Sequence, residues 1–336
     1  MASLKAYVIT RALLTIPMVL ILLTVIFFLL RILPGDPIRA MYGPKIPEDV
    51  AREIMHAWGL DKPWHLQYID YLLGLLHGDL GISYRTKRPV WDEIMTYFPA
   101  TLELSIFSMA IAVLFGALFG MLSAYRRGST LDTAVRLLAI SIYAVPIFWL
   151  GLMLQLAVLM SNTPIPISSR ISPLREPARI TGLYVLDSIL TCDVGALVDS
   201  LSHLALPSLT LGLVLSGAIL RLTRSNMLET LTADYVLAAR ARGIREFRVV
   251  FMYAFRNAII PVVTMAGMLF ALLMAGAVLT ENTFNWPGIG TYLVTCIANR
   301  DYPAIQGTVT FIAVLVAIVN LITDIVNAVL DPRIRY

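Results

Sequence analysis

Long apolar runs alternate with polar segments along the whole chain, and the polar segments are rich in Gly, Pro and Arg. Each run is about as long as the ~20 residues that a helix needs to cross ~30 Å of hydrocarbon. The pattern therefore predicts an all-α fold with six membrane-spanning helices. The spans are expected at residues 12–30, 102–125, 137–160, 204–222, 259–279 and 308–330.

The first run follows Lys5 and Arg11, and a basic start of this kind is also found in signal peptides. A signal peptide has an apolar region of only ~7–15 residues, followed by a cleavage site of small residues. Here Arg31 and the sequence Pro34-Gly35-Asp36-Pro37 come after the run instead. We therefore expect residues 1–31 to be an N-terminal segment with an uncleaved first span.

Residues 32–98 form a long polar segment that contains two amphipathic stretches. Apolar residues recur at helical spacing: Val50, Ile54 and Trp58 in the first stretch, and Trp64, Tyr68, Leu72 and Leu75 in the second. Pro47 and Gly59 mark the ends of the first predicted helix. Helices of this type lie in the headgroup layer, dock a partner or simply pack on the spans, and the pattern leaves these interpretations open.

Two of the predicted spans carry small residues at four-residue spacing. These residues are Ser108, Ala112, Gly116, Gly120 and Ala124 in one span, and Gly267, Ala271 and Ala275 in another. Small residues let another helix approach closely, so we expect packing faces here. Pro146 lies within the third span, where neighbouring helices can satisfy the carbonyl that it frees. Residues 161–203 are expected to form an exposed loop with one short helix near Asp187.

Composition agrees with a membrane protein. The 336 residues are 58% hydrophobic and 14% charged, where a soluble domain has about 25% charged residues. The net charge of +4 comes from arginines at the ends of apolar runs, which indicates topology and not nucleic-acid binding. Cys192 and Cys296 fall in predicted outer loops, so a bond between them stays an open question.

The distribution of Lys and Arg predicts the orientation. With six spans, most basic residues fall on one side, and short cytoplasmic loops carry this excess. They are Lys5, Arg11, Arg126, Arg127, Arg136, Arg221, Arg224, Arg240, Arg242, Arg245, Arg248, Arg256, Arg333 and Arg335. We expect both termini and the connection at residues 223–258 to be cytoplasmic.

That connection has an unusual composition for a loop. Tyr235, Ala238, Ala239 and Arg242 fall at three- and four-residue spacing, which predicts a helical face, and Gly243 lies where a helix would end. The two adjacent alanines allow close approach to the backbone. The stretch is either a surface helix that another protein grips or a solvated basic loop that only fixes topology.

Motifs of self-sufficient enzymes are missing from the sequence. None of the four lysines follows Gly, so the chain carries no P-loop, and H-E-x-x-H and G-x-S-x-G are also absent. An ion-gradient-driven carrier is the main rival interpretation, because intramembrane acids are functional candidates. Asn320 and Asp324, on one face of the last span, would be its polar site. Hydration or an arginine partner would equally satisfy Asp324.

An ordered series of short motifs resembles a known family over nearly the whole chain. The motifs are Pro34-Gly35-Asp36-Pro37, Gly59-Leu60-Asp61-Lys62-Pro63, His77-Gly78-Asp79-Leu80-Gly81, Pro99-Ala100-Thr101-Leu102-Glu103-Leu104, Thr223-Arg224-Ser225, Asp234-Tyr235, Ala239-Arg240-Ala241-Arg242-Gly243, Arg256-Asn257-Ala258, Trp286-Pro287-Gly288, Arg300-Asp301-Tyr302-Pro303 and Asp331-Pro332-Arg333-Ile334-Arg335. The chain is similar to the first permease subunit of dipeptide/oligopeptide ATP-binding-cassette importers.

The resemblance implies a type I importer permease fold, with an outer segment at residues 32–98 and a permease core at residues 99–336. It also implies that the 223–258 connection couples transport to ATP hydrolysis. In the family signature E-A-A-x-x-x-G, Ala238, Ala239 and Gly243 match, whereas Leu237 stands where many members have Glu. The expected coupling residues are Asp234, Tyr235, Ala238, Ala239, Arg240, Arg242 and Gly243.

The resemblance further implies an assembly in a prokaryotic inner membrane. Its partners would be a homologous second permease, two ATP-binding subunits and an extracytoplasmic solute-binding protein, with membrane lipid around the spans and no nucleic acid. ATP and Mg would be bound by the partner subunits, and this chain would have no cofactor, metal site or ATPase site of its own. Dipeptide is the expected substrate, while nickel chelates, haem and oligosaccharides stay open, as does a receptor role without transport.

Overall fold

The computed structural model describes residues 4–32, 38, 46–57, 59–173 and 175–330. Trp58 and the sequences Pro34-Gly35-Asp36-Pro37 and Asp331-Pro332-Arg333-Ile334-Arg335 lie outside the described residues. The helices are α1 (Leu4–Ile32), α3 (Glu48–Ala57), α4 (Trp64–Leu76), α5 (Val90–Tyr125), α6 (Thr130–Ala144), α7 (Ile147–Ser161), α8 (Tyr184–Leu190), α9 (Val194–Leu231), α10 (Asp234–Ala241), α11 (Glu246–Arg248), the π-helix η1 (Val249–Ala254), α12 (Phe255–Ala258), α13 (Ile260–Met274), α14 (Val278–Thr283), α15 (Ile289–Ala298) and α16 (Tyr302–Leu330).

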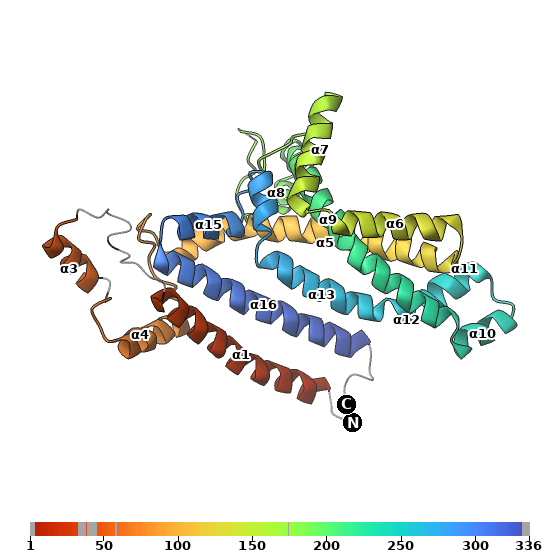
Figure 1. Cartoon of the computed structure of the whole chain (residues 1–336), viewed down its shortest axis with the longest axis horizontal. Coiled ribbons are helices and arrows are strands. Elements are labelled where there is room, and N and C mark those ends of the chain that lie inside the picture. Colours follow the sequence, from red (N-terminus) through yellow and green to blue (C-terminus); the bar gives the residue numbers. More distant parts are fainter. Residues whose placement is uncertain (1–3, 33–37, 39–45, 58, 174, 331–336) are drawn as a thin grey trace.

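The all-α prediction is confirmed. Four helices, α1, α5, α9 and α16, are individually long and apolar enough to cross a membrane. Two bent pairs, α6 with α7 and α11–α12 with α13, bring the number of candidate spans to six. The helices α1, α5, α9, α13 and α16 lie alongside one another (Figure 1). The start of α1 and the end of α16 lie on the same side of the molecule as α10 (Figure 1). We call this end the α10 end, and the opposite one the α15 end.

The third predicted span is not continuous. The axes of α6 and α7 differ by 104°, and α7 projects from the body of the molecule (Figure 1). The break lies at Val145, whose φ of −78° and ψ of 131° are extended. Proline disfavours helical geometry in the residue before it, so Pro146 ends one helix and starts the next. The third predicted span is therefore a pair of helices broken at Pro146 and not one continuous helix.

Other predicted boundaries also shift. α5 begins at Val90, so the last residues of the predicted outer segment are already helical. α9 covers 38 residues, which makes the end of the predicted outer loop and the first part of the 223–258 connection helical. The short helix expected near Asp187 is α8. The fifth span ends at Met274, because Gly276 has a φ of 103° and separates α13 from α14.

Both small-residue stripes are used inside this chain. The α5 stripe packs against α9, and the two helices run parallel: a β-carbon at Gly116 would lie 2.6 Å from Cγ2 of Ile219, and one at Gly120 would lie 2.7 Å from the Leu220 carbonyl oxygen. The α13 stripe packs against α16, where Thr323 occupies the space beside Gly267. Small side chains are required because the backbones approach so closely.

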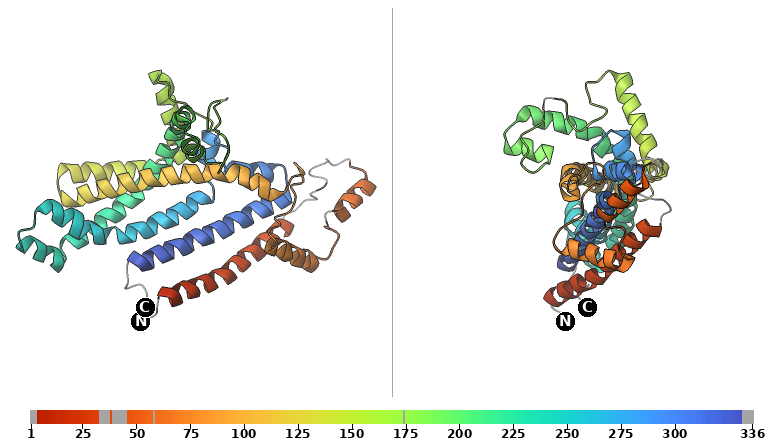
Figure 2. Two further views of the ribbon diagram at one scale, coloured as in Figure 1. Left: turned by 180° about the vertical axis from the view of Figure 1, so that it is seen from behind. Right: turned by 90° about the vertical axis from the view of Figure 1, so that its left-hand side faces the viewer.

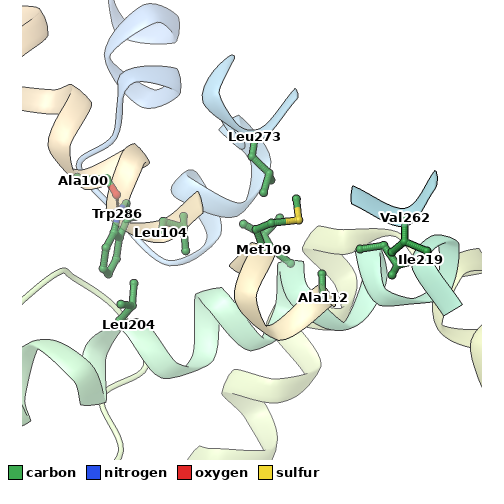
Figure 3. Close-up of a cluster of buried hydrophobic side chains, with 10 residues drawn as sticks. Ala100, Leu104, Met109, Ala112, Leu204, Ile219, Val262, Leu273 and Trp286 are labelled. Carbon is green, nitrogen blue, oxygen red and sulfur yellow. Dashed lines mark hydrogen bonds between the residues drawn. The ribbon is translucent and has the colours of Figure 1, made fainter. Parts of the chain in front are cut away.

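The largest hydrophobic core lies between α5, α9, α13 and the segment after α14. Trp286 is buried there together with Leu104 of α5 and Leu204 of α9 (Figure 3). The indole Nε1 of Trp286 donates a hydrogen bond of 2.9 Å to the carbonyl of Ala100. A buried indole needs such a partner, so this bond fixes where the segment crosses α5.

The two predicted amphipathic helices of the outer segment are α3 and α4. α4 lies crosswise at the end of α1 in the right-hand view of Figure 2. Tyr68 forms a hydrogen bond of 2.6 Å with Thr24 of α1, and Tyr71 forms one of 2.7 Å with Thr310 of α16. These bonds support packing on the spans as one role of α4. Its opposite face exposes Leu66, Ile69, Leu73 and Leu76.

The α5–α9 contact predicts a stability effect. Gly116→Ala should lower the free energy of unfolding by about 1–3 kcal/mol, because the added methyl group overpacks against Ile219 and the Ser216 carbonyl. The measurement is denaturant unfolding of the purified protein in detergent. Gly74→Ala in α4 is the control, since its nearest neighbour would lie at an ordinary 3.5 Å. Equal stability of both variants would contradict this packing.

Candidate functional site

The expected helix in the 223–258 connection is α10, and it ends where the sequence predicts. Asp234 lies in its first turn, where a negative charge is favourable beside the helix N-terminus. Gly243 has a φ of 72°, and its N–H donates to Arg240 O at 2.9 Å. The N–H of Ile244 donates to Ala239 O at 3.3 Å. This is a left-handed glycine cap, which satisfies carbonyls at the end of the helix.

One face of α10 is fixed to the body of the protein. Val236 and Ala239 are buried in a cluster with Met227 of α9 and Val249 of η1, and Met121 of α5 completes it. The hydrophobic pair at i and i+3 therefore faces inward. Ala239 was expected on the same exposed face as Ala238, and that expectation was wrong, because consecutive helical residues point in directions about 100° apart.

The other face of α10 is open. Asp234, Ala238 and Arg242 are exposed, and the side chain of Tyr235 is 43% exposed. Ala238 lies at the centre of this face, so the helix backbone is accessible between a tyrosine and an arginine. We call Asp234, Tyr235, Ala238 and Arg242 the outward face of α10. The expected residues other than Ala239, Arg240 and Gly243 are thus brought together on one surface.

Arg240 holds the connection together from within. Its guanidinium donates to both carboxylate oxygens of Glu246, at 2.8 and 3.2 Å, and to Leu231 O at 3.2 Å. The hydrogen bond and charge of Glu246 raise the pKa of Arg240 above its usual value. A bidentate pair of this kind has a defined geometry. Arg240 therefore joins α9, α10 and α11, and its side chain is already engaged inside the chain.

The return segment presents aromatic side chains beside α10. The rings of Phe247 and Phe251 stack at 4.4 Å, and Phe247 is 70% exposed. Asn257 donates a hydrogen bond of 3.1 Å to the hydroxyl of Tyr235, which ties α12 to the outward face. The π-helix η1 lies between α11 and α12, and π segments are rare and often found at functional sites. The α10 end thus combines a helical face with exposed apolar rings.

An ion pair between a buried carboxylate and a partly exposed arginine lies next to this connection, and sequence reasoning did not single it out. Arg224 of α9 donates to both oxygens of Asp132 on α6, at 2.9 and 3.0 Å. Ser123 of α5 donates to Asp132 at 2.5 Å, and the Gly128 N–H donates to it at 3.0 Å. The three helices are therefore joined by one buried carboxylate. Arg224 stands in the Thr223-Arg224-Ser225 motif, but nothing in the sequence indicated that Asp132 is its partner.

The polar pair of the last span is placed as its spacing predicts, on one face of α16. Asp324 pairs with Arg11 of α1 at 3.4 Å, and its side chain is 33% exposed. Asn320, one turn away, is half-buried. Arg11 is thus an arginine partner for Asp324, one of the two alternatives to a relay role that the sequence left open. Within the described part of the chain, no group of three His, Cys, Asp or Glu residues is arranged to hold a metal ion.

At the α15 end, several acids hold loops against helices. Glu103 of α5 pairs with Arg170 at 2.8 Å, with both side chains buried, and accepts from the Val185 N–H at 2.7 Å. Asp301 accepts from the Ser83 hydroxyl at 2.5 Å and from the backbone N–H of Tyr84 at 3.0 Å. Buried charges need such partners. Glu103 and Asp301 belong to the Pro99–Leu104 and Arg300–Pro303 motifs, whose role the sequence did not reveal.

The Asp132–Arg224 pair predicts non-additive stability. Asp132→Ala should cost about 1–3 kcal/mol of unfolding free energy, because it removes the acceptor shared by Arg224, Ser123 and the Gly128 N–H. The double variant with Arg224→Ala should cost less than the sum of the single changes. Denaturant unfolding in detergent measures all three. Arg136→Ala is the control, since Arg136 is 48% exposed and should contribute under about 1 kcal/mol. Simple additivity of the pair would contradict the arrangement.

Two family models match the chain. Residues 116–336 match the "binding-protein-dependent transport system inner membrane component", and residues 4–105 match the N-terminal part of such membrane components. The first match covers more than half of the chain, including α9, α10 and the Asp132–Arg224 pair.

Curated relatives cover nearly the full length. The di/tripeptide transport system permease protein DppB of Pseudomonas aeruginosa is 44% identical over 311 residues, which is 92% of this chain and 93% of the relative. The dipeptide transport system permease protein DppB of Escherichia coli K12 is 39% identical over 334 residues, 98% of each chain. The glutathione transport system permease protein GsiC of Salmonella choleraesuis is 37% identical over 330 residues, 98% of this chain and 99% of the relative. The chain therefore belongs to the inner-membrane permease components of binding-protein-dependent transport systems, the permeases of ATP-binding-cassette importers.

Proposed function

We propose that this permease imports dipeptides and other short peptides. The three relatives described above are named for transport of di/tripeptides, dipeptides and glutathione, and they align over nearly the whole chain. Such a permease forms half of a translocation pore, and a homologous second permease supplies the other half. A solute-binding protein delivers the peptide at the α15 end. Two ATP-binding subunits dock at the α10 end and hold the ATP and Mg, so this chain acts without an ATPase site of its own.

The observation that carries the coupling role is the outward face of α10, on a helix whose other face is packed against the body of the protein through Val236 and Ala239. Ala238 leaves the backbone accessible at the centre of that face, so a groove of an ATP-binding subunit can close around the helix. Exposed Phe247 next to it gives apolar area, and Arg242 gives a cation for an acidic rim. Burial of an aromatic anchor among polar contacts is typical of protein interfaces.

The hydrogen bonds that hold α10 also suggest how its movement would reach the membrane spans. Arg240 joins α10 to the end of α9, and Arg224 of α9 joins the Asp132 carboxylate on α6. A displacement of α10 is therefore carried to α9, α6 and α5 without passing through a flexible loop. ATP binding drives transport only if the ATP-binding subunits prefer one of two permease conformations. The contact on α10 is where that preference would act.

A carrier driven by an ion gradient fits less well. Its relay residue would be Asp324, and Arg11 already occupies that carboxylate at 3.4 Å. The family of the chain provides for energy from partner subunits instead. The proposal places the α10 end and both termini in the cytoplasm, in agreement with the excess of Lys and Arg at that end.

Coupling is tested at the centre of the outward face. Ala238→Trp in the assembled complex should reduce ATP-dependent peptide uptake into proteoliposomes at least about tenfold, because the indole holds the partner away from the helix backbone. The control is Ala238→Ser, which keeps a small side chain at the same exposed position and should retain uptake. Wild-type uptake by the Ala238→Trp complex, at normal subunit stoichiometry, would show that this face is not the docking surface.

Orientation is tested with the two cysteines, which are free in the structure. Cys192 is exposed in the turn between α8 and the start of α9, and Cys296 is buried, which raises the pKa of its thiol to about 12. A membrane-impermeant maleimide at neutral pH should therefore label Cys192 from outside intact spheroplasts, while Cys296 reacts only after unfolding. The Cys192→Ala and Cys296→Ala variants identify the labelled residue. Labelling of Cys192 only after permeabilisation would mean the opposite orientation.

A further inference from the structure

A cavity of about 350 Å³ opens at the α15 end, apart from the α10 contact. Its walls come from the start of α5, the loop before α8, the segment after α14, and α15. Ligand pockets for small molecules have volumes of about 300–1,000 Å³, so this cavity is large enough for one small solute.

The walls are aromatic and rigid. Tyr97 and Tyr292 stack with ring centroids 4.8 Å apart, and the hydroxyl of Tyr292 donates to the buried carboxylate of Glu93. Trp286 is held by its bond to the Ala100 carbonyl, which is drawn in Figure 3. The fourth aromatic ring is that of Tyr184, and the guanidinium carbon of Arg170 lies 3.9 Å from its centroid. Such a wall provides apolar and π contact for a side chain of variable identity.

The charges at the cavity are of two kinds. The charge of Arg170 is paired with Glu103 through hydrogen bonds of 2.8 and 3.1 Å. Arg170 is therefore part of the cavity wall and its charge is not available to a solute. Arg85 and Glu176 also line the cavity, and both residues are exposed. Within the described part of the chain, neither side chain takes part in a salt bridge. One cation and one anion are thus available to a solute that carries both charges.

The backbone at the cavity is strained at two points. Ser169 has a φ of 69° and Asn285 a φ of 49°, although neither is a glycine, and both line the cavity. The Ser169 N–H donates to Phe284 O at 2.8 Å, which holds the two segments together. Strain of this kind persists only where the surrounding structure enforces it, and it clusters at ligand sites. These two turns fix the loop backbones that form this part of the cavity wall.

We propose that this cavity is a receiving site for a short zwitterionic peptide. Arg85 binds the α-carboxylate, Glu176 binds the α-ammonium group, and the aromatic wall accepts a peptide side chain. The site rests on the proposed function and adds a substrate requirement to it: both termini of the peptide must be free. Peptide released by the binding protein is held here before it enters the pore.

Binding is measured with the purified complex of permeases and ATP-binding subunits in detergent, without the binding protein. The probes are radiolabelled alanyl-phenylalanine, its N-acetyl form and its C-terminal amide. Arg85→Gln should weaken binding of the free dipeptide at least about tenfold and leave binding of the amide nearly unchanged. Glu176→Gln should weaken binding of the free dipeptide equally and leave the N-acetyl form nearly unchanged. Arg88→Gln and Asp92→Asn, exposed and outside the cavity lining, should bind as wild type.

The outcomes separate this site from the proposed function. ATP-dependent uptake of the dipeptide with binding protein present tests the function itself. If wild-type uptake occurs but the complex alone binds free and capped peptides equally, or both cavity variants bind as wild type, the receiving site is refuted and the function stands. If both cavity variants bind the free dipeptide as wild type but lose uptake in the presence of binding protein, the cavity is a docking site for the binding protein and the peptide assignment is refuted. If wild-type complex takes up no peptide, the function itself fails.

Discussion

The close parallel packing of α5 on α9 is the contact on which the rest of the structure depends. Glycines at positions 116 and 120 bring the two backbones together, so α5 and α9 are packed tightly against each other as one rigid unit. At one end α5 carries Glu103, which holds the outer loop, and at the other it carries Ser123, which binds Asp132. A larger side chain in the stripe would separate the helices and disturb both ends together.

Buried charges fix the connections that apolar packing leaves free. Side chains in the core are non-directional in their attraction, whereas a carboxylate with two or three donors sets distances and angles. Asp132 therefore fixes α6 relative to α9, and Glu103 fixes the loop before α8. In both cases the pair joins segments far apart in sequence. Under the proposed coupling role, these pairs would carry a displacement at α10 to whole helices, as alternating access requires.

The hydrophobic pattern and motifs predicted much of the molecule: six apolar spans, the amphipathic α4, the short α8, and α10 with its glycine end. Such features depend on local chemistry, because helix length, Gly at positive φ and side-chain periodicity act within a few residues. Boundaries were less well predicted. Val90 starts α5 well before the apolar run, because α15 and α16 bury its first turns, and those residues are remote in sequence.

The sequence by itself determined the class of protein, the number of apolar runs and the surface helix at residues 234–241. Only the tertiary structure decided which face of that helix is outward, because burial of Ala239 depends on Met121 and Met227 from other helices. It also decided that Pro146 bends the third span, that Arg11 pairs with Asp324, and that Arg224 meets Asp132. These are pairings between residues distant in the chain, and no local pattern specifies which distant partner a side chain will meet.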